Sequence, residues 1–190
     1  MVKQFVNIRD IPCEEYERYF SLMLPEKQQR VERFRFEDGK KRTVIGEMLA
    51  RKMICEQCKV DEENIIFKTD VKGKPYTKSA DICFNISHSD EIVLCAVNDT
   101  AVGVDVEKVR EINSSVIEHT CNENELEYVY ENGISRHETL KRFFEIWTFK
   151  EACFKYKGTG IDEFLALDFF DCKRKRENGF VGDYAYCIIY

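Results

Sequence analysis

The order of strand-like and helical stretches constrains the fold most, because the same order occurs twice along the 190 residues. A strand-like opening is followed by helical periodicity and then by short apolar runs typical of strands, and the series starts again near residue 100. This order predicts an α+β fold built from two similar halves, each a small antiparallel sheet packed on helices. No repeat is visible in the letters, so the duplication is a hypothesis about shape.

Local patterns predict the individual elements. Pro25 suits the first turn of a helix, and Gly158 and Gly160 are expected to end a long helix that begins near residue 135. The C-terminal residues predict a hairpin whose turn lies in the polar stretch 173–179. Alternating apolar residues predict strands at 2–8, 65–67, 83–87, 91–97 and 101–107.

Composition excludes several classes of protein. The 29 Lys and Arg residues against 35 Asp and Glu residues give a net charge of −6, which disfavours nucleic-acid and anionic-membrane partners. No apolar run approaches the roughly 18 residues that a bilayer requires, and the N-terminus lacks the apolar core of a signal peptide. The nine cysteines are scattered and odd in number, which predicts reduced thiols rather than a disulfide framework. We therefore expect a cytoplasmic protein.

Charge is unevenly distributed. Residues 26–59 carry a local surplus of positive charge, although the chain as a whole is acidic. This basic segment is either a solvated helix face or a patch for a small polyanion. The turn Lys74-Pro75 is an ordinary loop or a means of holding the lysine in a fixed direction.

Two acidic motifs could support metal chemistry. Asp105 and Glu107 point to the same face of a predicted strand, where two carboxylates can converge on a hard cation such as Mg²⁺. Glu151 and Lys155 are four residues apart on a predicted helix and share one stripe. Each motif also has an ordinary interpretation, as an exposed strand face and as an exposed helical ion pair.

Ser87 and His88 end a predicted strand, where both side chains could donate to phosphate oxygens. No hydrolase signature surrounds the serine. Taken together, three carboxylates, a histidine, a serine and several lysines indicate metal-assisted chemistry on a diphosphate-like substrate.

Three spaced motifs resemble those of the 4′-phosphopantetheinyl transferases, in particular the pseudo-dimeric type that serves peptide and polyketide synthases. The motifs are FNISHS at 84–89, GVDVEK at 103–108 and WTFKEACFKYKGTGI at 147–161. The resemblance extends over about residues 1 to 165. It implies two α+β halves, 1–99 and 100–190, related by pseudo-twofold symmetry, with coenzyme A bound in the cleft between them.

The resemblance also implies an activity and a set of site residues. The family transfers the 4′-phosphopantetheine arm of coenzyme A to a serine of an apo acyl or peptidyl carrier protein and releases 3′,5′-ADP. Asp105, Glu107 and Glu151 match its positions for Mg²⁺, with Mn²⁺ as a substitute, and Glu151 also matches a general base. Lys155 matches the pyrophosphate contact. The positions that contact the nucleotide are matched by Lys27, Arg30, Arg42, Lys74 with Pro75, Ser87 and His88.

The partners follow from the same resemblance. We expect coenzyme A and a carrier protein, no nucleic acid, no membrane and a monomeric chain. Residues 112–126 correspond to a carrier-docking segment, but their apolar side chains could equally belong to the core. The alternatives are a non-catalytic module that binds coenzyme A or a carrier protein, and a metal-dependent phosphohydrolase.

Overall fold

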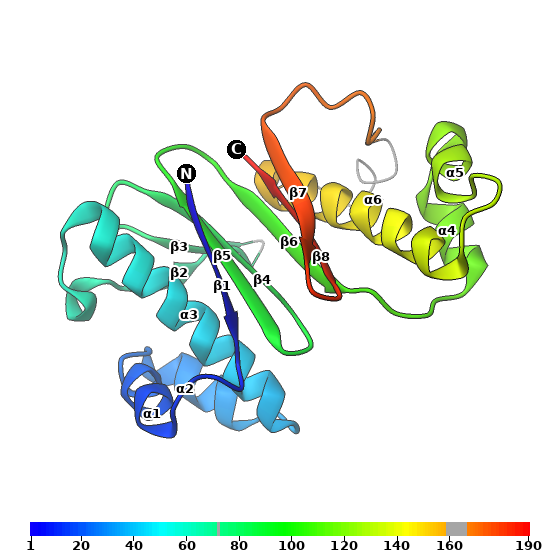
Figure 1. Cartoon of the computed structure of the whole chain (residues 1–190). Coiled ribbons are helices and arrows are strands. Elements are labelled where there is room, and N and C mark those ends of the chain that lie inside the picture. The colour runs from blue at the N-terminus through cyan, green and yellow to red at the C-terminus, as the bar shows by residue number, and fades with distance from the viewer. Residues whose placement is uncertain (72, 159–166) are drawn as a thin grey trace. The chain divides into compact units, whose positions relative to one another are not determined.

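The computed structural model describes residues 1–71, 73–158 and 167–190, and its chain divides into two compact units, Met1–Val102 and Gly103–Tyr190. Each unit combines helices with a small antiparallel sheet, so the predicted α+β class is confirmed (Figure 1). Within the described part of the chain, no helix is both long enough and apolar enough to span a membrane.

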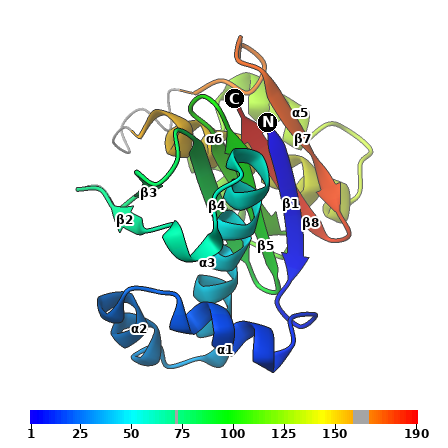
Figure 2. The same ribbon diagram turned by 90° about the vertical axis from the view of Figure 1, so that its left-hand side faces the viewer.

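The first unit contains a three-stranded sheet and a two-stranded one. The larger sheet has the order β1-β5-β4 with all pairs antiparallel, and β2 pairs with β3. A single 3₁₀ turn, Glu62–Asn64, follows the last helix. Figure 2 shows the helices of this unit and the long α3 beside the sheet. The elements are β1 (Val2–Asn7), α1 (Cys13–Ser21), α2 (Pro25–Glu32), α3 (Glu37–Cys58), β2 (Phe67–Thr69), β3 (Pro75–Thr77), β4 (Cys83–Ser89) and β5 (Ile92–Asn98).

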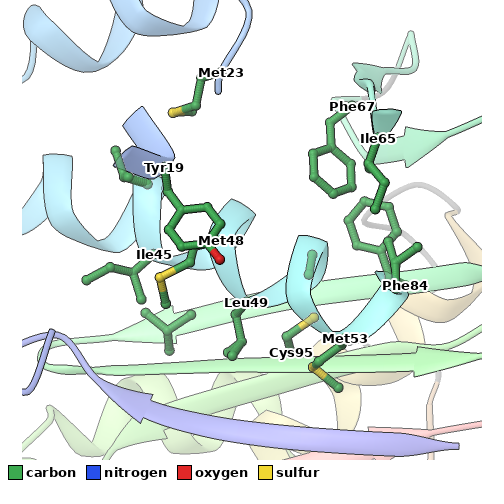
Figure 3. Close-up of a cluster of buried hydrophobic side chains, with 14 of the residues drawn as sticks. Tyr19, Met23, Ile45, Met48, Leu49, Met53, Ile65, Phe67, Phe84 and Cys95 are labelled. Atoms are coloured by element: carbon green, nitrogen blue, oxygen red, sulfur yellow. The ribbon is translucent and has the colours of Figure 1, made fainter. Parts of the chain in front are cut away.

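The core of the first unit lies between α3 and its larger sheet (Figure 3). Met48, Leu49 and Met53 of α3 are buried with Cys95 of β5. Gly46 allows the close approach, because a Cβ at this position would lie 3.0 Å from the Cγ2 atom of Ile86. The buried face of α3 therefore covers the larger sheet.

The second unit contains one sheet of order β6-β8-β7, again with antiparallel pairs. The Ser135 side chain accepts a hydrogen bond from the Glu138 amide at the start of the long helix, and Gly158 ends it with left-handed backbone angles. Gly158 is thus confirmed as a helix stop, whereas Gly160 lies outside the described residues. The elements are β6 (Gly103–Lys108), α4 (Ser114–Thr120), α5 (Glu123–Val129), α6 (Arg136–Lys157), β7 (Arg176–Val181) and β8 (Tyr184–Ile189).

The C-terminal hairpin has a different turn from the one predicted. Residues Arg176–Val181 form β7, so the expected turn at 173–179 is wrong, and the chain reverses at Gly182 and Asp183 instead. Gly182 has φ +57°, a conformation that glycine adopts without a steric penalty. The polar composition of 176–178 hid a strand, because β7 lies at the edge of the described sheet and pairs with β8 alone, and edge strands tolerate polar and charged residues.

Candidate functional site

The first unit contains a cavity of about 280 Å³ whose wall carries five of the predicted nucleotide-binding residues. Lys27 and Arg30 come from α2, where their three-residue spacing places both on one face. Arg42 comes from α3 and His88 from β4, and Pro75 begins β3. The structure therefore brings together residues from four elements that lie far apart in the sequence.

Two of these cations are held by other groups of the first unit. The Lys27 ammonium lies 2.8 Å from Glu47 Oε2 and 5.6 Å from the centre of the Phe67 ring. Arg42 donates a hydrogen bond of 2.9 Å to the backbone carbonyl of Asp90 in the β4–β5 turn. These contacts give both side chains a defined direction at the cavity wall.

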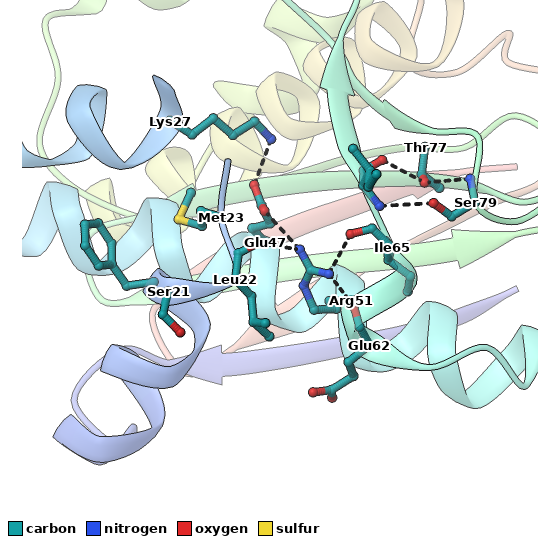
Figure 4. Close-up of polar contacts among 12 residues, drawn as sticks. Ser21, Leu22, Met23, Lys27, Glu47, Arg51, Glu62, Ile65, Thr77 and Ser79 are labelled. Carbon is teal, nitrogen blue, oxygen red and sulfur yellow. Dashed lines mark hydrogen bonds and ion pairs between the residues drawn. The ribbon is translucent and has the colours of Figure 1, made fainter. Parts of the chain in front are cut away.

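Glu47 is itself held by a buried arginine (Figure 4). The Nη2 atom of Arg51 lies 3.4 Å from Glu47 Oε1, and its Nη1 atom donates to the carbonyls of Glu62 and Ile65. Figure 4 shows Lys27, Glu47 and Arg51 in one continuous line of polar contacts. The sequence analysis did not single out Glu47 or Arg51, although their i,i+4 spacing on a helix was a usable signal.

Lys74 and Ser87 occupy different places from the other predicted residues. Lys74 lines a cavity of about 380 Å³ that also includes Pro75, and burial lowers the pKa of its ammonium group. Ser87 is buried and lies on the opposite face of β4 from His88, because side chains alternate along a strand. Neither side chain is among the residues that line the first cavity.

The second unit holds the predicted acidic residues on β6 and α6. The Lys155 ammonium lies 2.6 Å from Asp105 Oδ1, and the Asp105 side chain is buried. Burial raises the pKa of Glu151; the nearby Lys155 lowers it, and the carboxylate of Glu107 raises it further. The two motifs therefore act on one another electrostatically, a coupling that neither the strand spacing nor the helical spacing predicts.

Gly103 allows this approach of β6 to α6. A Cβ atom at Gly103 would lie 2.1 Å from the Ala152 carbonyl oxygen and 2.4 Å from the Tyr156 amide nitrogen. Any larger residue would force the strand away from the helix. The glycine that begins the GVDVEK motif thus sets the distance at which Asp105 meets Lys155.

Lys150, the neighbour of Glu151, faces a different environment. Its ammonium is fully buried, lies 2.8 Å from Glu125 Oε2 and donates to the Thr120 carbonyl. Glu125 also accepts hydrogen bonds from the amides of Asn122 and Phe169. The sequence analysis missed this pair, although the Asn-x-x-Glu spacing of a capping box marked Glu125.

The carboxylates of Asp105, Glu107 and Glu151 are chemically suited to a divalent cation, but they do not form a complete metal site by themselves. Carboxylate oxygens are the ligands that Mg²⁺ prefers, and Mg²⁺ usually takes its remaining ligands from water and substrate phosphates. Over residues 1–71, 73–158 and 167–190, no three His, Cys, Asp or Glu side chains are gathered into a preassembled metal site.

The segment 112–126 contributes to both core and surface. Ile117 is fully buried in the core of the second unit, and Leu126 packs against that core. Val116 is exposed on α4. The core interpretation thus holds for Ile117 and Leu126, and Val116 is the apolar residue of the three that a partner could contact.

Comparisons with known proteins match both units. A family model described as "4'-phosphopantetheinyl transferase, N-terminal" matches residues 12–100, and one described as "4'-phosphopantetheinyl transferase superfamily" matches residues 101–185. The chain is 32% identical to the 4'-phosphopantetheinyl transferase Sfp of Bacillus subtilis (strain 168) over 166 residues, which are 87% of this chain and 72% of Sfp.

Two further relatives are matched over a smaller part of their length. The chain is 38% identical over 136 residues to the 4'-phosphopantetheinyl transferase gsp of Aneurinibacillus migulanus. The matched residues are 72% of this chain and 56% of gsp. It is 37% identical over 137 residues to the 4'-phosphopantetheinyl transferase psf-1 of Bacillus pumilus. The matched residues are 72% of this chain and 58% of psf-1. The matched region is thus a little over half of these two proteins.

Proposed function

Because the chain belongs to the 4′-phosphopantetheinyl transferase superfamily, we propose that it transfers the 4′-phosphopantetheine arm of coenzyme A to a serine of an apo acyl or peptidyl carrier protein. The leaving group is 3′,5′-ADP. The observation that carries the proposal is the group of Asp105, Glu107, Glu151 and Lys155 on β6 and α6. Their type and spacing match the motifs by which the sequence resembles this family.

The first unit supplies the nucleotide contacts in this proposal. Lys27, Arg30, Arg42 and His88 line a single cavity, and a cavity with several cationic groups is suited to a ligand that carries several phosphates. Lys74, Pro75 and Ser87 are proposed as further contacts. We propose that these residues and the acidic group of the second unit serve one coenzyme A molecule, bound between the halves 1–99 and 100–190.

The second unit supplies the groups that act on the pyrophosphate. Mg²⁺ or Mn²⁺, bound by Asp105, Glu107 and Glu151, would offset the negative charge of the pyrophosphate. Glu151, directly or through water, accepts the proton of the attacking serine hydroxyl. Lys155 releases its contact with Asp105 and offsets charge on the departing 3′,5′-ADP. The bond formed joins the serine oxygen to the phosphorus of the arm, and the bond broken is that phosphorus to the bridging oxygen.

The setting of the reaction is part of the proposal. All nine cysteines lie in the described part of the chain and are free thiols, which is typical of a reducing compartment. This observation and the acidic net charge support a cytoplasmic protein that binds neither nucleic acid nor membranes. The proposed oligomeric state is a monomer.

The test is a transfer assay with the full chain. The protein, coenzyme A, Mg²⁺ and an apo carrier protein are incubated, and the carrier is weighed by mass spectrometry. We expect the carrier to gain the mass of one phosphopantetheine arm. No gain with any of several acyl and peptidyl carriers would overturn the proposal.

Two controls separate the alternatives. Coenzyme A that binds without any transfer would indicate a non-catalytic binding module, and phosphate release without a carrier would indicate a phosphohydrolase. Glu151→Gln is expected to abolish transfer while coenzyme A binding stays measurable. The matched control is Glu56→Gln, which makes the same charge change at an exposed position of α3.

A further inference from the structure

We propose that Glu47 is a positioning residue that holds the Lys27 ammonium at the wall of the phosphate-binding cavity. This inference rests on the proposed function, because it assigns Lys27 to a phosphate of coenzyme A. Among the described residues that line this cavity, Glu47 is the one carboxylate. A negative group in a cavity for an anion requires an explanation, and the contacts of Glu47 provide one.

Arg51 holds Glu47 from behind. The Arg51 side chain is 3% exposed and the Glu47 side chain 12%. Besides Glu47, the guanidinium contacts backbone carbonyls of Leu22, Glu62 and Ile65. A guanidinium with this many fixed acceptors has little freedom to move. Glu47 therefore has a rigid partner on the side away from Lys27.

The charges of Arg51, Glu47 and Lys27 explain why the Glu47 carboxylate does not prevent the cavity from binding an anion. Glu47 offsets the buried charge of Arg51, which would otherwise be costly to keep in the core. Lys27 then contributes a surplus charge of about one unit on the cavity side. The line Arg51–Glu47–Lys27 is thus a fixed support that ends in an ammonium group.

A lysine held in this way loses less freedom when a phosphate binds. Immobilising a long side chain usually weakens binding, so a preorganised one favours it. Glu47→Gln keeps the shape of the side chain and removes the charge that fixes Lys27. We expect the dissociation constant of coenzyme A to rise by about threefold to tenfold, with little change in the turnover rate at saturating coenzyme A.

The sign of this effect separates positioning from general electrostatics. Removal of a negative charge from an anion-binding cavity should by itself strengthen the binding of coenzyme A. Weaker binding by Glu47→Gln therefore requires a loss of positioning or a loss of structure. A double-mutant cycle with Lys27→Met separates these two causes.

The experiment is a calorimetric titration of the full chain with coenzyme A, for wild type, Lys27→Met, Glu47→Gln and the double variant. Positioning predicts that Glu47→Gln causes no further loss of affinity once Lys27 is replaced. An equal loss in both backgrounds, or tighter binding by Glu47→Gln, would overturn the inference. Thermal unfolding checks that each variant folds. If Glu47→Gln does not fold, Glu47→Gln with Arg51→Met replaces it, because this pair leaves no uncompensated buried charge.

Amine labelling gives a readout that does not depend on the activity. The wild type and Glu47→Gln are treated with an amine-reactive reagent in the absence of coenzyme A. Mass spectrometry then compares the rate at which Lys27 is modified with the rate at which the exposed Lys59 is modified. Faster labelling of Lys27 in Glu47→Gln supports the inference, and an unchanged rate contradicts it. Wild-type protein that binds no coenzyme A would instead contradict the proposed function.

Discussion

The buried pair of Lys150 and Glu125 yields the sharpest prediction for stability. Both side chains are fully buried and lie 2.8 Å apart. Lys150→Met would leave the Glu125 carboxylate buried with two backbone amides as its donors. Removal of one member of a buried ion pair typically costs about 3–5 kcal/mol. We expect the free energy of unfolding of the second unit to fall by about that amount.

The double variant tests whether charge is the cause. Lys150→Met with Glu125→Gln leaves no buried charge and keeps an acceptor oxygen for a backbone amide. Apolar or neutral replacements of a whole buried pair are often close to neutral in stability. The double variant should therefore be more stable than Lys150→Met alone, by roughly 2 kcal/mol or more.

The assay uses the single tryptophan of the chain. Trp147 lies on α6, so its fluorescence during urea unfolding reports on the second unit. Lys157→Met, at an exposed position of the same helix, is the matched control and should change stability by less than about 0.5 kcal/mol. A loss under about 1 kcal/mol for Lys150→Met, or a double variant no more stable than the single one, would refute the reasoning.

Other predictions follow from single contacts. Gly103→Ala should destabilise the second unit by about 1–3 kcal/mol or more in the same fluorescence assay, because its Cβ would lie 2.1 Å from the Ala152 carbonyl oxygen. Lys74→Met should raise the melting temperature of the first unit, since burial disfavours the ammonium, and should weaken coenzyme A binding in calorimetry. Iodoacetamide should label Cys13 and Cys83, which are exposed, in native protein analysed by mass spectrometry. Above about pH 8.5, the buried thiols should lower stability in urea titrations by about 1.4 kcal/mol per pH unit for each thiol, because unfolding allows them to ionise. Burial raises the pKa of the thiols of Cys55, Cys95, Cys121, Cys153 and Cys187.

Sequence patterns predicted the parts of the site that depend on local periodicity. Asp105 and Glu107 share a strand face and Glu151 and Lys155 share a helix stripe, and strand and helix geometry alone place them so. The contact of Asp105 with Lys155 joins residues 50 positions apart, and no periodicity could predict it. The contact depends on Gly103, and the need for glycine at this position can be recognised only when the opposing helix is known.

The buried polar groups escaped prediction for a different reason. Arg51 and Lys150 belong to residue types that are seldom buried, so a pattern of charges on a helix indicates a solvated face. Arg51 contacts Glu47 and three backbone carbonyls, and Lys150 contacts Glu125 and the Thr120 carbonyl, so each buried charge has partners. The local surplus of positive charge in 26–59 therefore includes Arg51, which is not among the residues that line the cavity.

The two units share one topology and differ in the chemistry they place on it. In the three-stranded sheet of each unit, the last strand along the chain lies in the middle, between the first strand and its own hairpin partner. The orders are β1-β5-β4 and β6-β8-β7. The β4–β5 and β7–β8 hairpins both reverse over two residues, the first of which, Asp90 or Gly182, has a positive φ. This identity of order supports the duplication inferred from the sequence.

Equivalent positions on the first strand of each unit carry different side chains. Gln4 pairs with Cys95 on β5, and Asp105 pairs with Cys187 on β8, each as the third pair of its ladder. The first unit thus has a neutral amide where the second has a carboxylate, and its cations gather in a cavity beside α2 and α3 instead. If this divergence separates nucleotide binding from chemistry, Gln4→Asp should leave transfer unchanged, whereas Asp105→Gln should abolish it. Measured transfer by Asp105→Gln at the wild-type rate would show that the carboxylate of β6 is not what distinguishes the second unit.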